Sequence, residues 1–154
     1  MFEHLQNYRQ LFQNLSDWTT TNAKLVIHVF CHIKYAYFFE TQGDDNWLGK
    51  YFFTGGVMPA KDTFSYFADD FDINQEQWIS GVHYQKTAKA WRDNLVRNAS
   101  LIMPVLSEVY GSADAAKWFQ RWKMFFIACE ELFGFRNGTQ WGVCIYTMDK
   151  KTRG

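Results

Sequence analysis

The run KLVIHVFCH, from Lys24 to His32, constrains the fold more than any other segment of this chain. Most of its residues are apolar and several are β-branched, which favours an extended backbone over a helix. An apolar run of this kind, without strict alternation of apolar and polar residues, is typical of a strand buried on both faces, as in a parallel sheet covered by helices. We therefore expect an α/β protein whose sheet contains Lys24–His32.

Two further strands and an N-terminal helix are also predicted. Residues 71–81 and 139–148 alternate sufficiently to be predicted as strands. Residues 2–18 carry apolar side chains at helical spacing and are expected to form one amphipathic helix. Helical structure would then be expected from Met1 onward, with no preceding residue to act as its N-cap.

Two long helices are predicted between the second and third strands. Residues 87–109 have a helical apolar stripe, which we expect to kink or break near Pro104 and to end at Gly111. Residues 115–133 show the strongest helical pattern, with Gly134 expected as the C-cap.

The connections are expected to be irregular. Residues 36–47, with a turn cluster at 43–46, and residues 51–59 read as loops, while residues 62–68 favour a short helix. The pattern therefore contains only about three strands, fewer than the five or more usual in an open α/β sheet, so the sheet is expected to be incomplete.

The aromatic content is the outlier of the composition. The chain has 154 residues, which suits one domain, and includes 15 Phe, 8 Tyr and 7 Trp. Such a content predicts a bulky core, an aromatic-lined pocket, or a face that lacks its partner.

Charge and cysteine content exclude several classes of partner. Sixteen basic and sixteen acidic residues cancel, so nonspecific nucleic-acid binding is not expected. Cys31, Cys129 and Cys144 are far apart and form no CxxC pair, which favours free buried thiols over a zinc site. The N-terminus lacks the apolar stretch of a signal peptide, and no apolar run reaches the roughly 18–20 residues of a membrane helix. A cytoplasmic protein with no integral membrane segment is expected.

Adjacent acidic and imidazole side chains are the first candidate for chemistry. The Glu3 carboxylate can orient the His4 ring and raise its basicity, which makes a general base. Alternatively, both are solvated residues of the first helical turn. His28 lies within the strand run, either as a satisfied core residue or facing the ligand crevice at the carboxyl end of the strand.

Aromatic clusters are the second candidate. The groups Tyr51-Phe52-Phe53 and Trp122-Phe125-Phe126 either line a pocket or belong to the core. Neither glycine-rich phosphate-binding pattern, G-x-G-x-x-G or GxxxxGK[ST], occurs in the chain.

Four segments, taken together and in order, resemble a known family. They are MFEH, YFFTGGVMP, GVHYxxTxxxWRDN and RWKMFFIACEELFG. This order is similar to that of the cyclopropane-fatty-acid synthase and coclaurine N-methyltransferase group of S-adenosylmethionine-dependent methyltransferases, over essentially the whole chain. Thr54, in place of the inner proline of the cyclopropane synthases, is similar to the coclaurine N-methyltransferase branch.

The resemblance implies that residues 1–154 are the C-terminal half of a class I (Rossmann-like) methyltransferase domain. The half that carries the glycine-rich loop for the cofactor, S-adenosylmethionine, would be absent. The three strands would then be the fifth, sixth and seventh of the family fold, in the order 5-7-6 with the last strand antiparallel. The inner edge of this partial sheet would be exposed.

The resemblance also implies residue roles. Glu3 and His4 match the residues that serve as orienting group and base for the substrate amine in the coclaurine-type enzymes. His28 matches a histidine that helps to hold bicarbonate in the cyclopropane synthases, whereas a tyrosine of that site is replaced by Phe125. The missing hydroxyl favours methyl transfer to nitrogen over cyclopropanation. Candidate substrate contacts are His28, Phe30, Tyr51, Tyr84, Trp122 and Phe125.

Three functions remain open at this point. The first is N-methylation of a small apolar or aromatic amine, in which a cation–π contact with Trp122 or Phe125 holds the charged product. The second is a cyclopropane-synthase-like activity on a lipid. The third is a non-catalytic fragment, whose partner is the missing half or, through exposed apolar surface, a second copy of the chain.

Overall fold

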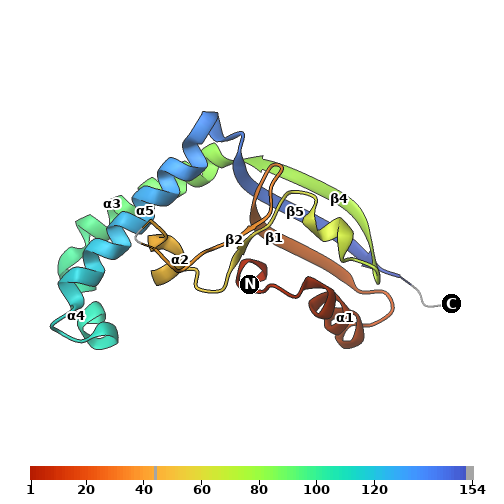
Figure 1. Cartoon of the computed structure of the whole chain (residues 1–154), viewed down its shortest axis with the longest axis horizontal. Coiled ribbons are helices and arrows are strands. Elements are labelled where there is room, and N and C mark those ends of the chain that lie inside the picture. The colour runs from red at the N-terminus through yellow and green to blue at the C-terminus, as the bar shows by residue number, and fades with distance from the viewer. Residues whose placement is uncertain (44, 152–154) are drawn as a thin grey trace. The chain divides into compact units, whose positions relative to one another are not determined.

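The computed structural model describes residues 1–43 and 45–151 (Figure 1). Within the turn cluster expected at residues 43–46, Asp44 lies outside the described residues. The chain divides into two compact units, and each is described by itself. The sheet unit comprises Met1–Ser80 with Gln140–Gly154, and the helical unit comprises Gly81–Thr139.

The sheet unit contains a three-stranded sheet in the order β1-β5-β4 (Figure 1). The three strands are β1 (Lys24–His32), β4 (Phe71–Ser80) and β5 (Trp141–Lys150). Strand β5 lies in the middle and runs antiparallel to both neighbours. The predicted order, with the last strand antiparallel between the other two, is therefore confirmed.

The prediction that β1 is buried on both faces is wrong. The side chains of Ile27, Val29 and Cys31 are buried, whereas Val26 is 62% exposed and His28 is also exposed. Because successive side chains of a strand point to opposite faces, β1 has one buried face and one largely open face. Its described sheet partner is an antiparallel strand, a pairing in which one open face is common.

The buried face of the sheet is covered by an aromatic core. Phe64 is fully buried and contacts the rings of Phe2, Tyr8, Phe12 and Tyr146 at centroid distances between 5.1 and 5.9 Å. All four contacts are edge-to-face, the arrangement that the charge distribution of aromatic rings favours. Part of the aromatic excess is thus core.

The helix expected over residues 2–18 is two elements. A 3₁₀ turn, η1 (Phe2–His4), is followed by extended backbone at Leu5, and α1 (Tyr8–Trp18) begins after Asn7. The Asn7 side-chain oxygen accepts a hydrogen bond from the Gln10 backbone N–H at 3.0 Å, which is an N-cap. The expectation of a helix already running at Met1 is therefore wrong, since capping by Asn7 starts the helix later.

The expected loops contain short regular pieces. Strands β2 (Tyr37–Phe38) and β3 (Val57–Met58) pair antiparallel, and α2 (Trp47–Tyr51) lies between them in the chain. A second 3₁₀ helix, η2 (Thr63–Tyr66), occupies part of the short helix predicted over 62–68.

The helical unit contains α3 (Gly81–Arg97), α4 (Ala99–Tyr110) and α5 (Ala115–Gly138). The break that was expected near Pro104 occurs at Asn98, and Pro104 lies inside α4. The Asn98 backbone leaves the helical region, and its side-chain amide donates a hydrogen bond to the Asn94 carbonyl oxygen at 2.9 Å. The chain turns again at Gly111, whose φ of 84° confirms the predicted helix end.

Helices α3 and α5 lie side by side and run in opposite directions (Figure 1). An Arg92–Glu130 ion pair at 2.5 Å connects them. Gly134, predicted as the C-cap, directly precedes Phe135, where the backbone leaves helical geometry, and does not itself have a positive φ. The absent side chain of Gly134 instead makes room for the Gln85 amide of α3, which a β-carbon there would approach within 2.4 Å.

Cys31 and Cys144 are buried thiols, and Cys129 is half-buried. None of the described helices combines the length and the apolar character that crossing a membrane requires.

Candidate functional site

The Glu3–His4 pair lies on η1, in the sheet unit. One carboxylate oxygen of Glu3 accepts a hydrogen bond from the Met1 N-terminal ammonium at 2.9 Å, and the other lies 3.9 Å from His4 Nε2. Burial on its own would raise the pKa of Glu3, but hydrogen bonds from the ammonium and the backbone outweigh it, so that this pKa lies below its usual value. The pair therefore combines an ionised carboxylate with a half-exposed imidazole.

Phe53 forms the surface on which the His4 ring rests. The two rings stack with centroids 5.8 Å apart and an interplanar angle of 21°. Phe53 also contacts Phe39, stacked at 4.9 Å, and Phe30 of β1, edge-on at 5.8 Å. Sequence reasoning grouped Phe53 with its neighbours as possible pocket lining but missed its contact with His4, because residues 4 and 53 are brought together only by the tertiary fold.

The Gly55-Gly56 pair holds this arrangement together. Gly55 has a φ of 74°, a conformation that favours glycine. A β-carbon on Gly56 would lie 2.7 Å from the Glu3 carbonyl oxygen, so only glycine permits the loop to approach η1 this closely. The motif YFFTGGVMP thus positions the Glu3–His4 segment.

His28 and Phe30 share the open face of β1, since they are two residues apart on the strand. His28 pairs in register with Ile145 and is exposed, so the alternative of a satisfied core histidine is wrong. Phe30 is half-buried and reaches the Phe53 ring. Tyr51, at the end of α2, contacts the Trp47 ring at 5.9 Å and the Lys50 ammonium at 5.7 Å.

His32 is a structural residue that the sequence did not single out. It is 5% exposed, and its Nδ1 accepts hydrogen bonds from the backbone N–H groups of Lys34 and Tyr35 at 3.0 and 2.8 Å. Burial lowers the pKa of His32. A neutral ring that accepts at Nδ1 fixes the turn after β1.

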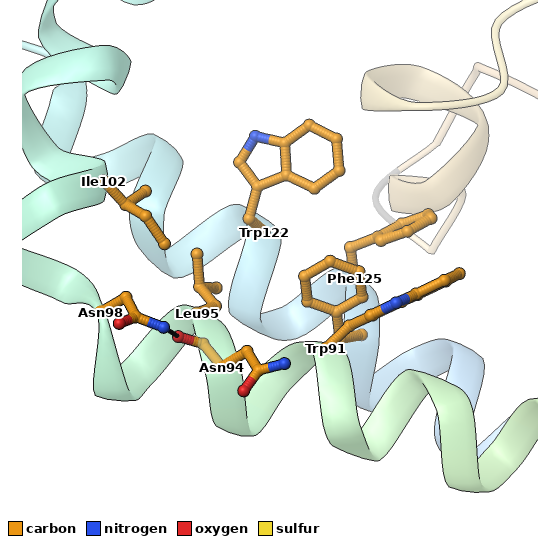
Figure 2. A pocket seen from close by; sticks show the side chains of 8 residues that line it. Trp91, Asn94, Leu95, Asn98, Ile102, Trp122 and Phe125 are labelled. Carbon is orange, nitrogen blue, oxygen red and sulfur yellow. Dashed lines mark hydrogen bonds between the residues drawn. The ribbon is translucent and has the colours of Figure 1, made fainter.

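The helical unit contains a cavity of about 550 Å³ that is widely open to solvent (Figure 2). Helix α5 contributes Trp122, Phe125 and Phe126, and α3 contributes Trp91. The Trp122 ring lies 5.6 Å from Phe125 and 6.1 Å from Phe126 between centroids, and the Trp91 ring lies 5.9 Å from Phe126. Two predicted substrate contacts, Trp122 and Phe125, therefore line one cavity, whose volume falls within the range of small-molecule sites.

Tyr84 lies behind the cavity instead of lining it. Its ring packs 4.3 Å from Phe133 and 5.9 Å from Trp91. It packs edge-on against Trp91, one residue of the lining.

The residues described here do not form a nucleotide cradle. The only paired glycines of the sequence are Gly55 and Gly56, and Gly56 is closed off by the Glu3 backbone. We therefore assign no cofactor contact to this chain. Over residues 1–43 and 45–151, no group of three or more His, Cys, Asp or Glu side chains is arranged to hold a metal ion.

Comparison with protein families identifies the relationship. The family model described as mycolic acid cyclopropane synthetase matches residues 1–141. The chain belongs to this family. Its similarity to the mycolic acid cyclopropane synthetase family thus includes η1, the Gly-Gly loop and all three helices of the helical unit.

Curated proteins similar to this chain include plant N-methyltransferases. The chain is 32% identical to an (S)-coclaurine N-methyltransferase of Thalictrum flavum subsp. glaucum, over 98% of the chain and 43% of that protein. It is 27% identical to the enzyme of the same name from Papaver somniferum, over 98% of the chain and 44% of that protein. The chain therefore spans less than half the length of the curated relatives it matches.

Solved structures support the same assignment of the fold. A crystal structure of coclaurine N-methyltransferase bound to N-methylheliamine and SAH superposes with a TM-score of 0.88 at 30% identity, covering 97% of this chain and 45% of that one. A cyclopropane synthase of Mycobacterium tuberculosis superposes with a TM-score of 0.73 at 17% identity, covering 97% and 52%, which shows the fold alone. Both are class I methyltransferases, so this chain has part of that fold.

Proposed function

We propose that the chain is the acceptor-substrate half of an S-adenosylmethionine-dependent N-methyltransferase that acts on a small apolar or aromatic amine. The observation that carries the proposal is the His4 imidazole, which lies beside an ionised carboxylate and stacks on Phe53. The similarity to coclaurine N-methyltransferases over 98% of the chain supports the reaction class.

In this proposal His4 is the general base. An amine attacks only through its free electron pair, so the proton of an ammonium substrate must first be removed. His4 takes that proton, and the Glu3 carboxylate, 3.9 Å from Nε2, then stabilises the imidazolium. Phe53 keeps the imidazole ring in one orientation, so that the proton is accepted in a fixed direction.

The methyl donor of the complete protein is S-adenosylmethionine, the cofactor of the family, which supplies an activated methyl group on sulfur. The relative of known structure was crystallised with SAH. No residue of this chain is proposed to contact the cofactor, because the described glycines do not form a cradle for it.

Lipid cyclopropanation is the weaker alternative. The ring of Phe125 packs on Trp122 and Phe126 and offers no hydroxyl with which to hold an anion. His28 lies on the open face of β1, and no described interaction connects it with Glu3 or His4.

We also propose that the protein acts in the cytoplasm. The three free cysteines support a reducing compartment, where thiols persist.

Methyl transfer from radiolabelled S-adenosylmethionine to tetrahydroisoquinoline tests the function. The assay is run on the chain alone and on the chain mixed with the N-terminal half of (S)-coclaurine N-methyltransferase. We expect activity in the mixture, and a fall of about 100-fold or more in kcat for His4→Gln, the loss expected when a general base is removed. His83→Gln, which changes an exposed histidine of α3, is the matched control.

Two results would contradict the proposal. Full activity of His4→Gln would exclude the assigned base. Absence of methyl transfer from every mixture, with both halves folded, would favour the non-catalytic alternative.

A further inference from the structure

The cavity of the helical unit is lined by rings and aliphatic groups from all three helices. Trp91 and Leu95 come from α3, Ile102 from α4, and Trp122 and Phe125 from α5 (Figure 2). Leu95 is 8% exposed and forms the floor, whereas Trp91 is 45% exposed. The ring most open to solvent is therefore on α3, whereas the two predicted contacts are on α5.

The lining offers no charge to a ligand. Among the described lining residues none is acidic or basic, and the two polar ones are Asn94 and Asn98. The Asn98 amide N–H donates to the Asn94 carbonyl oxygen at 2.9 Å, and the Asn94 side-chain oxygen accepts from Arg97 at 3.3 Å. Each amide thus has one hydrogen-bond partner within the protein.

The acidic side chains that neighbour the lining along the helices are also paired. Asp93 lies 2.6 Å from the Lys89 ammonium, and Glu130 lies 2.5 Å from the Arg92 guanidinium. An ammonium group in the cavity would find no carboxylate in the lining to neutralise it, and only cation–π contacts with the rings would offset its removal from water.

Trp91 is held in place by other rings. It contacts Tyr84 edge-on and Phe126 at an inclined angle, both with centroids 5.9 Å apart. Tyr84 is in turn packed on Phe133 at 4.3 Å. Because these contacts hold Trp91 from two sides, its indole forms a fixed wall and not a mobile side chain.

We propose that this cavity binds the uncharged ring system of the acceptor, not its amine, and that Trp91 is a specificity-determining residue that limits the width of the ring system admitted. The inference rests on the proposed function, which supplies the class of ligand. It adds which part of that substrate the helical unit binds. The reacting nitrogen is left outside the cavity.

Binding of fluorinated probes, followed by ¹⁹F NMR on the whole chain, tests the inference without methyl transfer. The probes are 4-fluorobenzyl alcohol, 4-fluorobenzylammonium and 1-fluoronaphthalene. We expect the alcohol to bind at least as tightly as the ammonium of the same shape. A ten-fold preference for the ammonium would overturn the assignment of the cavity to an uncharged group.

The variant Trp91→Ala tests the width. Removing the indole should raise the affinity for 1-fluoronaphthalene relative to 4-fluorobenzyl alcohol about ten-fold, because the smaller ring loses an aromatic wall and the larger ring gains space. Trp91→Phe should restore most of the original ratio. Trp18→Ala, at a residue 74% exposed in the sheet unit, should leave it unchanged.

An unchanged ratio in Trp91→Ala, or the same change in Trp18→Ala, would exclude Trp91 as the selective residue. Failure of the proposed function would look different, because the probes would still bind and respond to Trp91 while no methyl transfer occurred.

Discussion

At the scale of single residues, His32 shows how a buried imidazole is kept neutral. Its Nδ1 is an acceptor for two backbone N–H groups, and a protonated ring can accept neither. Protonation would thus cost both hydrogen bonds, in addition to placing a charge in a buried position.

The pH dependence of stability follows from the lowered pKa of His32. The unfolded chain takes up a proton on this ring near its ordinary pKa of about 6.5, before the folded chain does. Stability is therefore fully present above that pH, and is lost as the pH falls from there through the lower pKa of the folded state. We expect the urea midpoint to decrease between pH 7.5 and pH 5.

Comparison of two variants tests whether His32 causes this dependence of stability on pH. His32→Asn, whose side-chain oxygen can still accept a hydrogen bond, should flatten the dependence on pH, whereas His83→Gln should retain it. Equal slopes in both variants would mean that another group is responsible.

The stacking of His4 on Phe53 predicts a change that does not depend on activity. Ring currents of a stacked phenyl group shift the imidazole protons of His4 upfield, and Phe53→Leu should move them back towards the position of a solvated histidine. The measurement is the His4 ring-proton chemical shift. Phe38→Leu, at a ring 64% exposed, is the control, and a shift that follows Phe38 would contradict the contact.

The same contact marks a limit of sequence reasoning at this scale. The adjacency of Glu3 and His4 could be predicted, because it is a property of neighbouring residues. The support of His4 by Phe53 could not, because nothing in the local spacing of YFFTGGVMP indicates which distant ring it meets.

At the scale of elements, the two glycines of the 51–59 loop have different roles that substitution can separate. Gly55→Ala meets no atom within 4 Å but must adopt a φ of 74°, which costs roughly 1–2 kcal/mol. Gly56→Ala places a β-carbon 2.7 Å from the Glu3 carbonyl oxygen, and such overpacking costs about 1–3 kcal/mol.

Both variants should lower the free energy of unfolding, measured in urea. Only Gly56→Ala should also change the chemical shifts of His4, because only that substitution pushes on η1. An equal response of His4 in the two variants would show that the loop acts through its backbone conformation alone.

The helix boundaries show which elements the sequence could predict. The strand Lys24–His32 was predicted at its observed bounds, since its apolar run is clearly delimited. The start of α1 was missed because the Asn7 cap interrupts an apolar stripe that continues on both sides of it. The break at Asn98 was missed because Pro104 was the stronger local signal. Pro104 removes one helical hydrogen bond, but α4 continues past it to Tyr110.

At the scale of the whole molecule, large apolar side chains remain at the surface of each unit. Among the described residues they include Trp18, Val26 and Leu101, which are 74%, 62% and 72% exposed. Apolar side chains that are exposed together bind other surfaces or promote association. The aromatic excess was predicted to include a face that lacks its partner, and these positions are consistent with that interpretation.

We therefore expect the isolated chain to bind a hydrophobic dye and to associate as its concentration rises. Sedimentation velocity at increasing concentrations measures the association, and adding the N-terminal half of the coclaurine N-methyltransferase should reduce it. A chain that stays monomeric and binds no dye would contradict the expectation.

The central place of β5 has a consequence for biosynthesis. Lys24 pairs with Asp149, so β1 cannot complete this pairing until β5 has left the ribosome. The helical unit is one continuous segment, Gly81–Thr139, and its contacts can form while translation is still in progress. Folding of the sheet, in contrast, depends on pairings of long sequence separation and is expected to be slow. During that interval the nascent β1 would expose its apolar residues, which makes it a natural target for a chaperone.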